Sequence, residues 1–143
     1  MNTFDLEILT PERTIFHAAV RAVTVPAEDG RLGVLAGHAP LLCVLQAGEV
    51  DITAEDGAAE LIVVTGGFLE VEENRARILA DGGERAEDID RERAEAALER
   101  ARERLKRRGD PEVDVDRAEV ALRRAISRIQ VLGKRDRLPG RHR

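Results

Sequence analysis

The spacing of hydrophobic residues along this 143-residue chain changes near residue 86. Before that point apolar residues recur at every second position, as Phe4, Leu6 and Ile8 do between acidic neighbours. After it they recur at every third or fourth position. A period of two is typical of half-buried strands and a period near 3.6 of amphipathic helices. The change therefore indicates an α+β chain, with an all-β part followed by a helical part.

Short extended segments bounded by Gly, Asn, Asp or Pro fill the first part. We predict strands at 3–9, 18–25, 32–35, 41–45, 48–53, 60–64, 68–72 and 75–79. Strands this short need a second layer to bury their apolar faces, so we expect a β-sandwich or flattened barrel over residues 1–86. The Thr-Gly-Gly-Phe segment at 65–68 lacks the Lys-Ser/Thr of a phosphate loop and is followed by a strand, so we interpret it as a bulge or tight turn.

The second part contains one motif twice, first from Asp88 and again from Asp114, each an Asp-x-Asp-Arg opening followed by an alanine-rich stretch. The acidic openings suit helix N-termini, and Asp116 with Glu119 has the capping-box spacing. Arg-Gly-Asp-Pro at 108–111 interrupts the helical pattern. We predict an antiparallel α-helical hairpin over residues 87–133, with alanines that let the two backbones approach closely.

The hairpin offers little apolar area for packing, because alanine and arginine dominate its faces. At about 25 cal/mol per Å² such burial is marginal against the entropy of ordering the helices. We therefore expect the hairpin to detach and rearrange. The basic segment at 134–143 shows no periodicity, and we expect it to be disordered.

The balance of charged residues also changes near residue 86. Residues 1–86 contain 6 Lys or Arg and 15 Asp or Glu, whereas residues 87–143 contain 17 and 13. The arginines of the hairpin raise the question of nucleic-acid binding, but acidic residues lie among them and no aromatic residues provide stacking surfaces, so a solvated helix face is favoured. A free-standing adaptor that binds RNA or an acidic protein through the hairpin remains an alternative.

Several classes of protein are disfavoured by composition. Cys43 is the only cysteine, which excludes an internal disulfide and argues against a thiolate metal site. The N-terminus has no basic, apolar leader, and no apolar run approaches the roughly 20 residues that span a bilayer. His38 has no ligand-spaced partner and no catalytic constellation stands out, so we expect neither a metal site nor an enzyme.

One group in the hairpin has the chemistry of an anion site. Asp90, Arg93 and Ala94 lie about one turn apart, and Arg124 and Arg128 lie one turn apart on the second helix. Guanidinium groups suit phosphate oxygens, Asp90 can accept from a sugar hydroxyl or an amino group, and Ala94 leaves room for a flat ring. The alternative is helix capping with surface ion pairs.

Three segments together resemble one family. They are Phe-Asp-Leu-Glu-Ile-Leu-Thr-Pro-Glu at 4–12, the run at 28–41 that ends in Gly-His-Ala-Pro-Leu, and Gly-Gly-Phe-Leu-Glu-Val at 66–71. With the helical repeat, their order resembles the epsilon subunit of the F-type ATP synthase over about residues 3–133. Two positions depart from the family pattern, since Ala36 replaces a common proline and Arg31 an acidic or neutral residue.

The resemblance implies a non-catalytic subunit of the central stalk. In the family the sandwich contacts the gamma subunit and the ring of c subunits, and the hairpin extends toward the catalytic alpha/beta head to restrain ATP hydrolysis. We thus expect a peripheral protein at the cytoplasmic face of the bacterial plasma membrane, attached only through the complex, which couples proton-driven rotation to ATP synthesis and binds no nucleic acid. By resemblance, the loop that faces the ring and gamma contains Glu28, Arg31 and His38.

Some bacterial members bind ATP through an Ile/Leu-Asp-x-x-Arg-Ala motif, which is complete here as Ile89-Asp90-Arg91-Glu92-Arg93-Ala94. The resemblance implies ATP as a regulatory ligand, with no cofactor required. The ATP contacts that it implies are Glu84, Ile89, Asp90, Arg93, Ala94, Arg100, Arg124 and Arg128.

Overall fold

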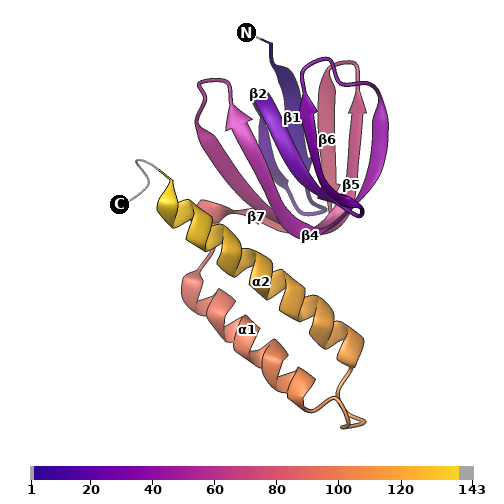
Figure 1. The fold of residues 1–143 in the computed structure, drawn as a ribbon, viewed down its shortest axis with the longest axis vertical. Coiled ribbons are helices and arrows are strands. Elements are labelled where there is room, and N and C mark those ends of the chain that lie inside the picture. The colour runs from indigo at the N-terminus through magenta and orange to yellow at the C-terminus, as the bar shows by residue number, and fades with distance from the viewer. Residues whose placement is uncertain (1, 139–143) are drawn as a thin grey trace.

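A computed structural model describes residues 2–138, which form a β-barrel with a helical hairpin at one end (Figure 1). The strands are β1 (Phe4–Leu9), β2 (Thr14–Ala27), β3 (Gly30–Leu35), β4 (Leu41–Ala54), β5 (Ala59–Glu72), β6 (Arg75–Ala80) and β7 (Gly83–Arg85). A 3-10 helix, η1 (Ala86–Asp88), leads to helices α1 (Arg91–Lys106) and α2 (Val115–Arg137). The predicted fold class, an all-β part followed by a helical hairpin, is confirmed.

Five strands close on themselves, in the order β1, β6, β5, β4, β2 and back to β1. All of these pairs are antiparallel except β1 with β6, which is parallel. Strand β3 adds to β2, and the short β7 adds to β5. The closed circuit leaves the barrel with few free strand edges and fixes β5 between two neighbours.

Two pairs of predicted strands are in fact single long strands. The segments expected at 41–45 and 48–53 join as β4, and those at 60–64 and 68–72 join as β5. These two strands pair along their whole length, from Leu41 opposite Val71 to Thr53 opposite Ala59. The breaks predicted at residues 46–47 and at the Thr-Gly-Gly-Phe segment were wrong, because the glycines in or beside them interrupt the side-chain pattern without ending the hydrogen-bonded ladder.

Gly66 and Gly67 distort β5 without turning the chain. Both have positive φ angles, +118° and +134°, and β5 keeps its register with β4 on either side of them. The inward positions of β5 change from even-numbered residues such as Val64 to odd-numbered ones such as Leu69. A Cβ at position 67 would lie 2.1 Å from the Leu79 carbonyl oxygen, so only glycine fits there.

The barrel interior is filled by large aliphatic side chains and two phenylalanines. Leu6, Ile8, Ile62, Leu69 and Ile78 are all fully buried. In β1 and β6 they alternate with outward-facing residues, as the sequence pattern predicts. This cluster is the main hydrophobic core of the chain.

The two helices are capped by aspartates and packed through alanines. Asp90 and Asp114 each accept a hydrogen bond from the backbone N–H three residues later, at 3.2 and 3.1 Å. The second cap is therefore Asp114 and not the Asp116 that the capping-box spacing indicated. The buried alanines of the hairpin, which allow the close packing of α1 and α2, are Ala94, Ala101, Ala118 and Ala125.

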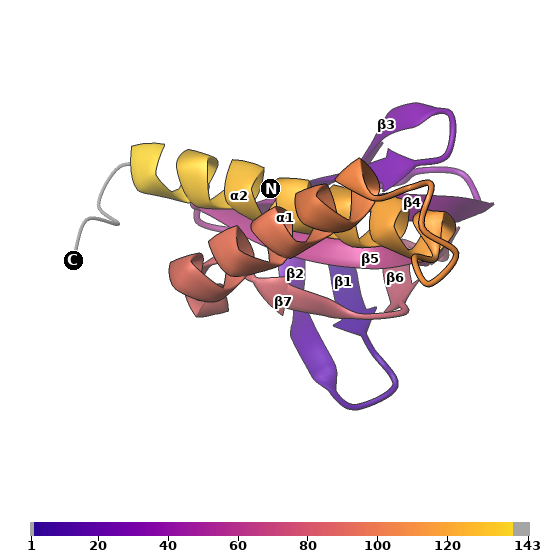
Figure 2. The same cartoon turned by 90° about the horizontal axis from the view of Figure 1, so that it is seen from below.

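Helix α2 lies between α1 and the barrel, and the hairpin crosses the end of the barrel (Figures 1 and 2). Its buried residues Val131 and Leu132 belong to a second apolar cluster with Leu61 and Val63 on the outer side of β5. The helix continues to Arg137, so the prediction of disorder is wrong for residues 134–137. The rest of that prediction, for residues 139–143, lies outside the described residues.

Candidate functional site

A pocket of about 310 Å³ lies where the hairpin joins the barrel. Strand β7, the segment after it, and helices α1 and α2 all contribute to its wall. Seven of the eight residues implied as ATP contacts line it, and Arg124 does not. The lining residues are Glu84, Asp88, Ile89, Asp90, Arg93, Ala94, Ala97, Arg100 and Arg128.

The start of helix α1 positions the first wall of this pocket. Asp90 is the N-cap, and its Oδ1 atom accepts a hydrogen bond from the Arg93 backbone N–H at 3.2 Å. Capping holds the Asp90 carboxylate at the N-terminus of α1, where the first backbone N–H groups also favour negative charge. Ile89 and Ala94 are buried beside it and give this wall an apolar surface.

The opposite wall contains an ion pair between the barrel and the second helix. Arg128 Nε of α2 lies 2.6 Å from Glu84 Oε1 of β7, and both side chains are partly exposed. The pair joins two elements that are far apart in the sequence. Arg93 and Arg100 make no side-chain ion pair or hydrogen bond with another described residue, so their guanidinium groups are available to a ligand.

Arg124 lines a second pocket, of about 530 Å³, next to the first. The two pockets share Glu84, Ala97 and Arg128. The second also includes Arg13, from the turn between β1 and β2. A phosphate chain that entered this space from the first pocket would meet further guanidinium groups, whose forked N–H donors match phosphate oxygens.

Sequence reasoning missed Asp88, Ala97 and Arg13. The first two lie within one turn of the motif residues, so helical spacing alone could have added them. No local signal links Arg13 to the site, because it is separated from the motif by most of the barrel sequence. Only the folded barrel brings it to the second pocket.

The pocket combines acidic and basic side chains. Carboxylates of Glu84, Asp88 and Asp90 can accept hydrogen bonds from hydroxyl or amino groups, and the guanidinium groups can donate to phosphate oxygens. Among residues 2–138 no group of three or more His, Cys, Asp and Glu residues has the arrangement of a metal site. The arrangement thus suits a ligand with both a polar ring system and an anionic tail.

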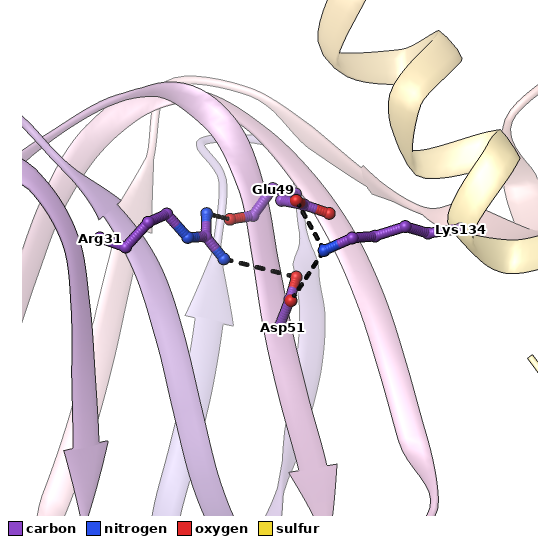
Figure 3. A network of polar contacts seen from close by, with 4 residues as sticks. All are labelled: Arg31, Glu49, Asp51 and Lys134. Atoms are coloured by element: carbon purple, nitrogen blue, oxygen red, sulfur yellow. Dashed lines mark hydrogen bonds and ion pairs between the residues drawn. The ribbon is translucent and has the colours of Figure 1, made fainter.

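The residues expected to face the ring and gamma lie at and around strand β3. Glu28 lies in the turn between β2 and β3, Arg31 near the start of β3, and His38 in the loop after the end of β3. Arg31 turns toward strand β4, where it donates a hydrogen bond to the Glu49 carbonyl oxygen at 2.5 Å (Figure 3). That Glu28, Arg31 and His38 face the c ring and the gamma subunit stays a prediction.

Both parts of the chain match models of one protein family. Residues 3–86 match the ATP synthase, Delta/Epsilon chain, beta-sandwich domain, and residues 87–133 match the ATP synthase, Delta/Epsilon chain, long alpha-helix domain. The ATP synthase epsilon chain of Bacillus subtilis is 46% identical over 110 residues, which are 77% of this chain and 83% of that relative. That of Carboxydothermus hydrogenoformans is 50% identical over 103 residues, or 72% and 76%.

Solved structures give the same result. A chain in the Euglena gracilis mitochondrial ATP synthase assembly of OSCP, F1 and c-ring superposes with a TM-score of 0.81 at 28% identity, covering 92% of this chain and 82% of that one. A chain of the Tetrahymena thermophila central stalk and c-ring has a TM-score of 0.53 at 17% identity, a likeness of fold alone. In the described part of the chain, no helix is long and apolar enough to cross a membrane.

Proposed function

Because this chain belongs to the ATP synthase delta/epsilon chain family, as a non-catalytic epsilon-type subunit of that complex, we propose that it couples rotation of the central stalk to ATP synthesis and that its hairpin regulates ATP hydrolysis in response to ATP. In this proposal the barrel stays attached to the gamma subunit and the c ring. The hairpin either lies against the barrel or extends toward the alpha/beta head.

The observation that supports a nucleotide response is the position of the pocket. Its wall is built from the barrel, from the segment between β7 and α1, and from both helices. The pocket is therefore complete only when the hairpin is folded against the barrel. A ligand that binds this arrangement and not the extended one shifts the population toward the folded hairpin. ATP has the adenine, ribose and phosphate groups that the mixed acidic and basic lining suits.

The proposed attachment to the rotor is supported by an exposed apolar surface on the barrel. Val44, Phe68 and Leu79 are direct neighbours across strands β4, β5 and β6, and their exposed fractions lie between 43% and 49%. Leu42, on the same side of β4, is 70% exposed. An apolar cluster of this kind on a small protein is typical of a binding surface. In this proposal the surface binds the rotor, and the protein is at the membrane only as part of the complex.

Calorimetric titration of the full chain with ATP and with ADP tests the nucleotide response. We expect saturable heat with ATP that is lost in the Arg93→Ala variant, which removes a pocket guanidinium without touching the cap. Asp90→Ala should also lose the heat, and Asp90→Asn separates the two roles of this residue because asparagine is an equally good N-cap but carries no charge. Arg123→Ala, on the exposed side of α2, is the control.

Absence of heat with ATP up to millimolar concentration would contradict the nucleotide response.

A second experiment measures the effect on ATP hydrolysis in the assembled complex, with wild type or Arg93→Ala as its epsilon subunit. We expect ATP to relieve inhibition less in the complex with the variant, because the folded hairpin is no longer stabilised. Equal relief in both complexes would contradict regulation through this pocket.

A further inference from the structure

The C-terminal end of helix α2 makes a polar contact with the barrel outside the pocket of about 310 Å³, which we call the nucleotide pocket. Lys134 Nζ lies 2.9 Å from Glu49 Oε1 and 3.2 Å from Asp51 Oδ2 (Figure 3). The two carboxylates are two residues apart on β4, so both point to the outer side of the barrel. One ammonium group of the hairpin thus bridges two carboxylates of the barrel. None of the three residues lines the nucleotide pocket.

Arg31 contacts the same two residues of β4, but it reaches the carboxylate of Asp51 only. Its guanidinium donates to the Glu49 carbonyl oxygen, and its Nη2 atom lies 3.5 Å from Asp51 Oδ1. Glu49 Oε2 and Asp51 Oδ1 are nevertheless buried and accept no hydrogen bond in the structure. The carboxylates therefore depend on Lys134 for much of their compensation, and removal of the ammonium would leave partly buried negative charge.

Neighbouring contacts hold the same end of the helix. Arg135 Nη1 donates a hydrogen bond to the Ala86 carbonyl oxygen at 3.0 Å, and Asp136 pairs with Arg91 at the start of α1. Val131 and Leu132, one turn earlier, are buried on the outer side of β5. Glu49 is paired with Val63 and Asp51 with Leu61 across strands β4 and β5. The apolar residues and the carboxylates that contact α2 therefore lie side by side on the barrel.

We propose that Lys134, Glu49 and Asp51 form an electrostatic latch that holds helix α2 on the barrel and sets how much ATP the hairpin needs. The first half of this inference, the latch, stands by itself. The second half, the control of how much ATP the hairpin needs, rests on the proposed function. The latch and the nucleotide pocket both require the folded hairpin, so they stabilise one and the same state. When the folded state is less populated, the apparent affinity for the ligand falls in proportion to its fraction.

The charge state of Lys134 supports the latch. Its hydrogen bond to Glu49, more than any other contact, raises the pKa of Lys134 above the ordinary value of 10.5, against an opposing effect of burial. The ammonium is therefore charged at all physiological pH values. Salt, which screens partly exposed charges, is the variable to which the latch should respond.

Amide hydrogen exchange of the full chain measures the latch without nucleotide. Lys134→Met keeps a long apolar stem and removes the charge, and we expect the amides of residues 128–137 to exchange about five-fold faster at low salt, with no change in the barrel strands. Arg123→Met, also on α2 but exposed and without an ion pair to another described residue, should leave the exchange unchanged. In wild type, raising the salt from about 0.05 to 0.5 M should speed exchange of the same amides, and in Lys134→Met it should not.

A rescue variant distinguishes charge from packing. Adding Glu49→Gln and Asp51→Asn to Lys134→Met removes the uncompensated carboxylates, so we expect protection of α2 to return toward the wild-type level. Unchanged exchange in Lys134→Met, or no recovery in the triple variant, would overturn the latch. Both measurements are made without ATP and do not depend on the proposed function.

The second half of the proposal is tested by calorimetry with ATP. We expect Lys134→Met to bind ATP up to about five-fold more weakly than wild type, although Lys134 does not touch the pocket. Equal affinity, together with faster exchange, would show a latch that does not set the nucleotide response and would overturn this half. If wild type itself binds no ATP, the proposed nucleotide response fails and this half with it, whereas the exchange result still decides the latch.

Discussion

The barrel and the hairpin of this chain are held together by different kinds of residue. The barrel encloses one continuous cluster of leucine, isoleucine, valine and phenylalanine side chains. The hairpin packs its two helices through alanines and rests on the barrel through a small cluster around Val131 and Leu132 and through ion pairs. Since stabilisation follows the apolar area removed from water, the barrel should be the rigid part and the hairpin the movable one.

Strand β5 shows how the two regions can be separable although they share a strand. Its inward side chains Ile62 and Val64 belong to the barrel core, whereas its outward side chains Leu61 and Val63 form the seat of the hairpin. Loss of the hairpin would expose only the outer side of β5. Loss of β5 would open the closed barrel. The dependence therefore runs in one direction, from hairpin to barrel.

Truncation of a buried side chain inside the barrel should have the largest effect. Leu69 is fully buried in the core, and Leu69→Ala should lower the free energy of unfolding by about 2–5 kcal/mol, because it leaves a cavity between strands that cannot move apart. Urea denaturation followed by far-ultraviolet circular dichroism measures the loss. A change below about 1 kcal/mol would contradict the assignment of this cluster as the structural core.

The same truncation in the seat of the hairpin should act locally. Leu132 is as completely buried as Leu69, but Leu132→Ala should loosen the hairpin and leave the barrel folded. We expect the exchange protection of α1 and α2 amides to fall while that of the barrel strands stays within a factor of two. Equal loss of protection in both regions would show that hairpin and barrel unfold as one unit.

Sequence patterns predicted the barrel and the hairpin but not how they join. Alternation located the strands, and the repeated Asp-x-Asp-Arg opening located both helices. The run from Leu61 to Val64 is apolar at every position, a sign of burial on both sides, yet it does not tell which element covers the outer side. The role of Gly67 depends on a carbonyl of β6 that only the folded ladder brings near.

The candidate site was predictable to the extent that it is local. The start of α1 supplies Ile89, Asp90, Arg93 and Ala94 within two turns, and the family resemblance added the more distant residues. Arg124 was expected in the same pocket but faces the adjoining one. The sequence does not reveal the Lys134 latch, because its partners are 83 and 85 residues away and because the basic segment at 134–143 shows no helical periodicity.

Removal of the first helix cap should have a smaller effect, of about 1 kcal/mol. Asp90→Ala deprives the Arg93 N–H of its acceptor, so the first turn of α1 should fray while the rest of the hairpin stays folded. Exchange of the amides of residues 91–94 measures this effect. Asp90→Asn should preserve the protection, and equal fraying in both variants would contradict the capping role.

The smallest expected effect is that of alkaline pH on the hairpin. The pKa of Lys134 is raised in the folded state, so its contribution is complete below the ordinary value of 10.5 and is lost as the pH rises through the higher folded value. We expect protection of the last turns of α2, corrected for the intrinsic exchange rate, to stay constant between pH 7 and 9 and to fall above pH 10.5. A loss of protection centred between pH 7 and 9 would contradict this assignment.

Native-state hydrogen exchange of the full chain in increasing urea tests the central claim most directly. If the hairpin is the movable part, its amides exchange through an opening of lower free energy than the barrel amides, with a weak dependence on urea, since little surface is exposed. ATP should then raise the protection of the hairpin and leave that of the barrel unchanged. A single opening free energy for all helices and strands would contradict the account.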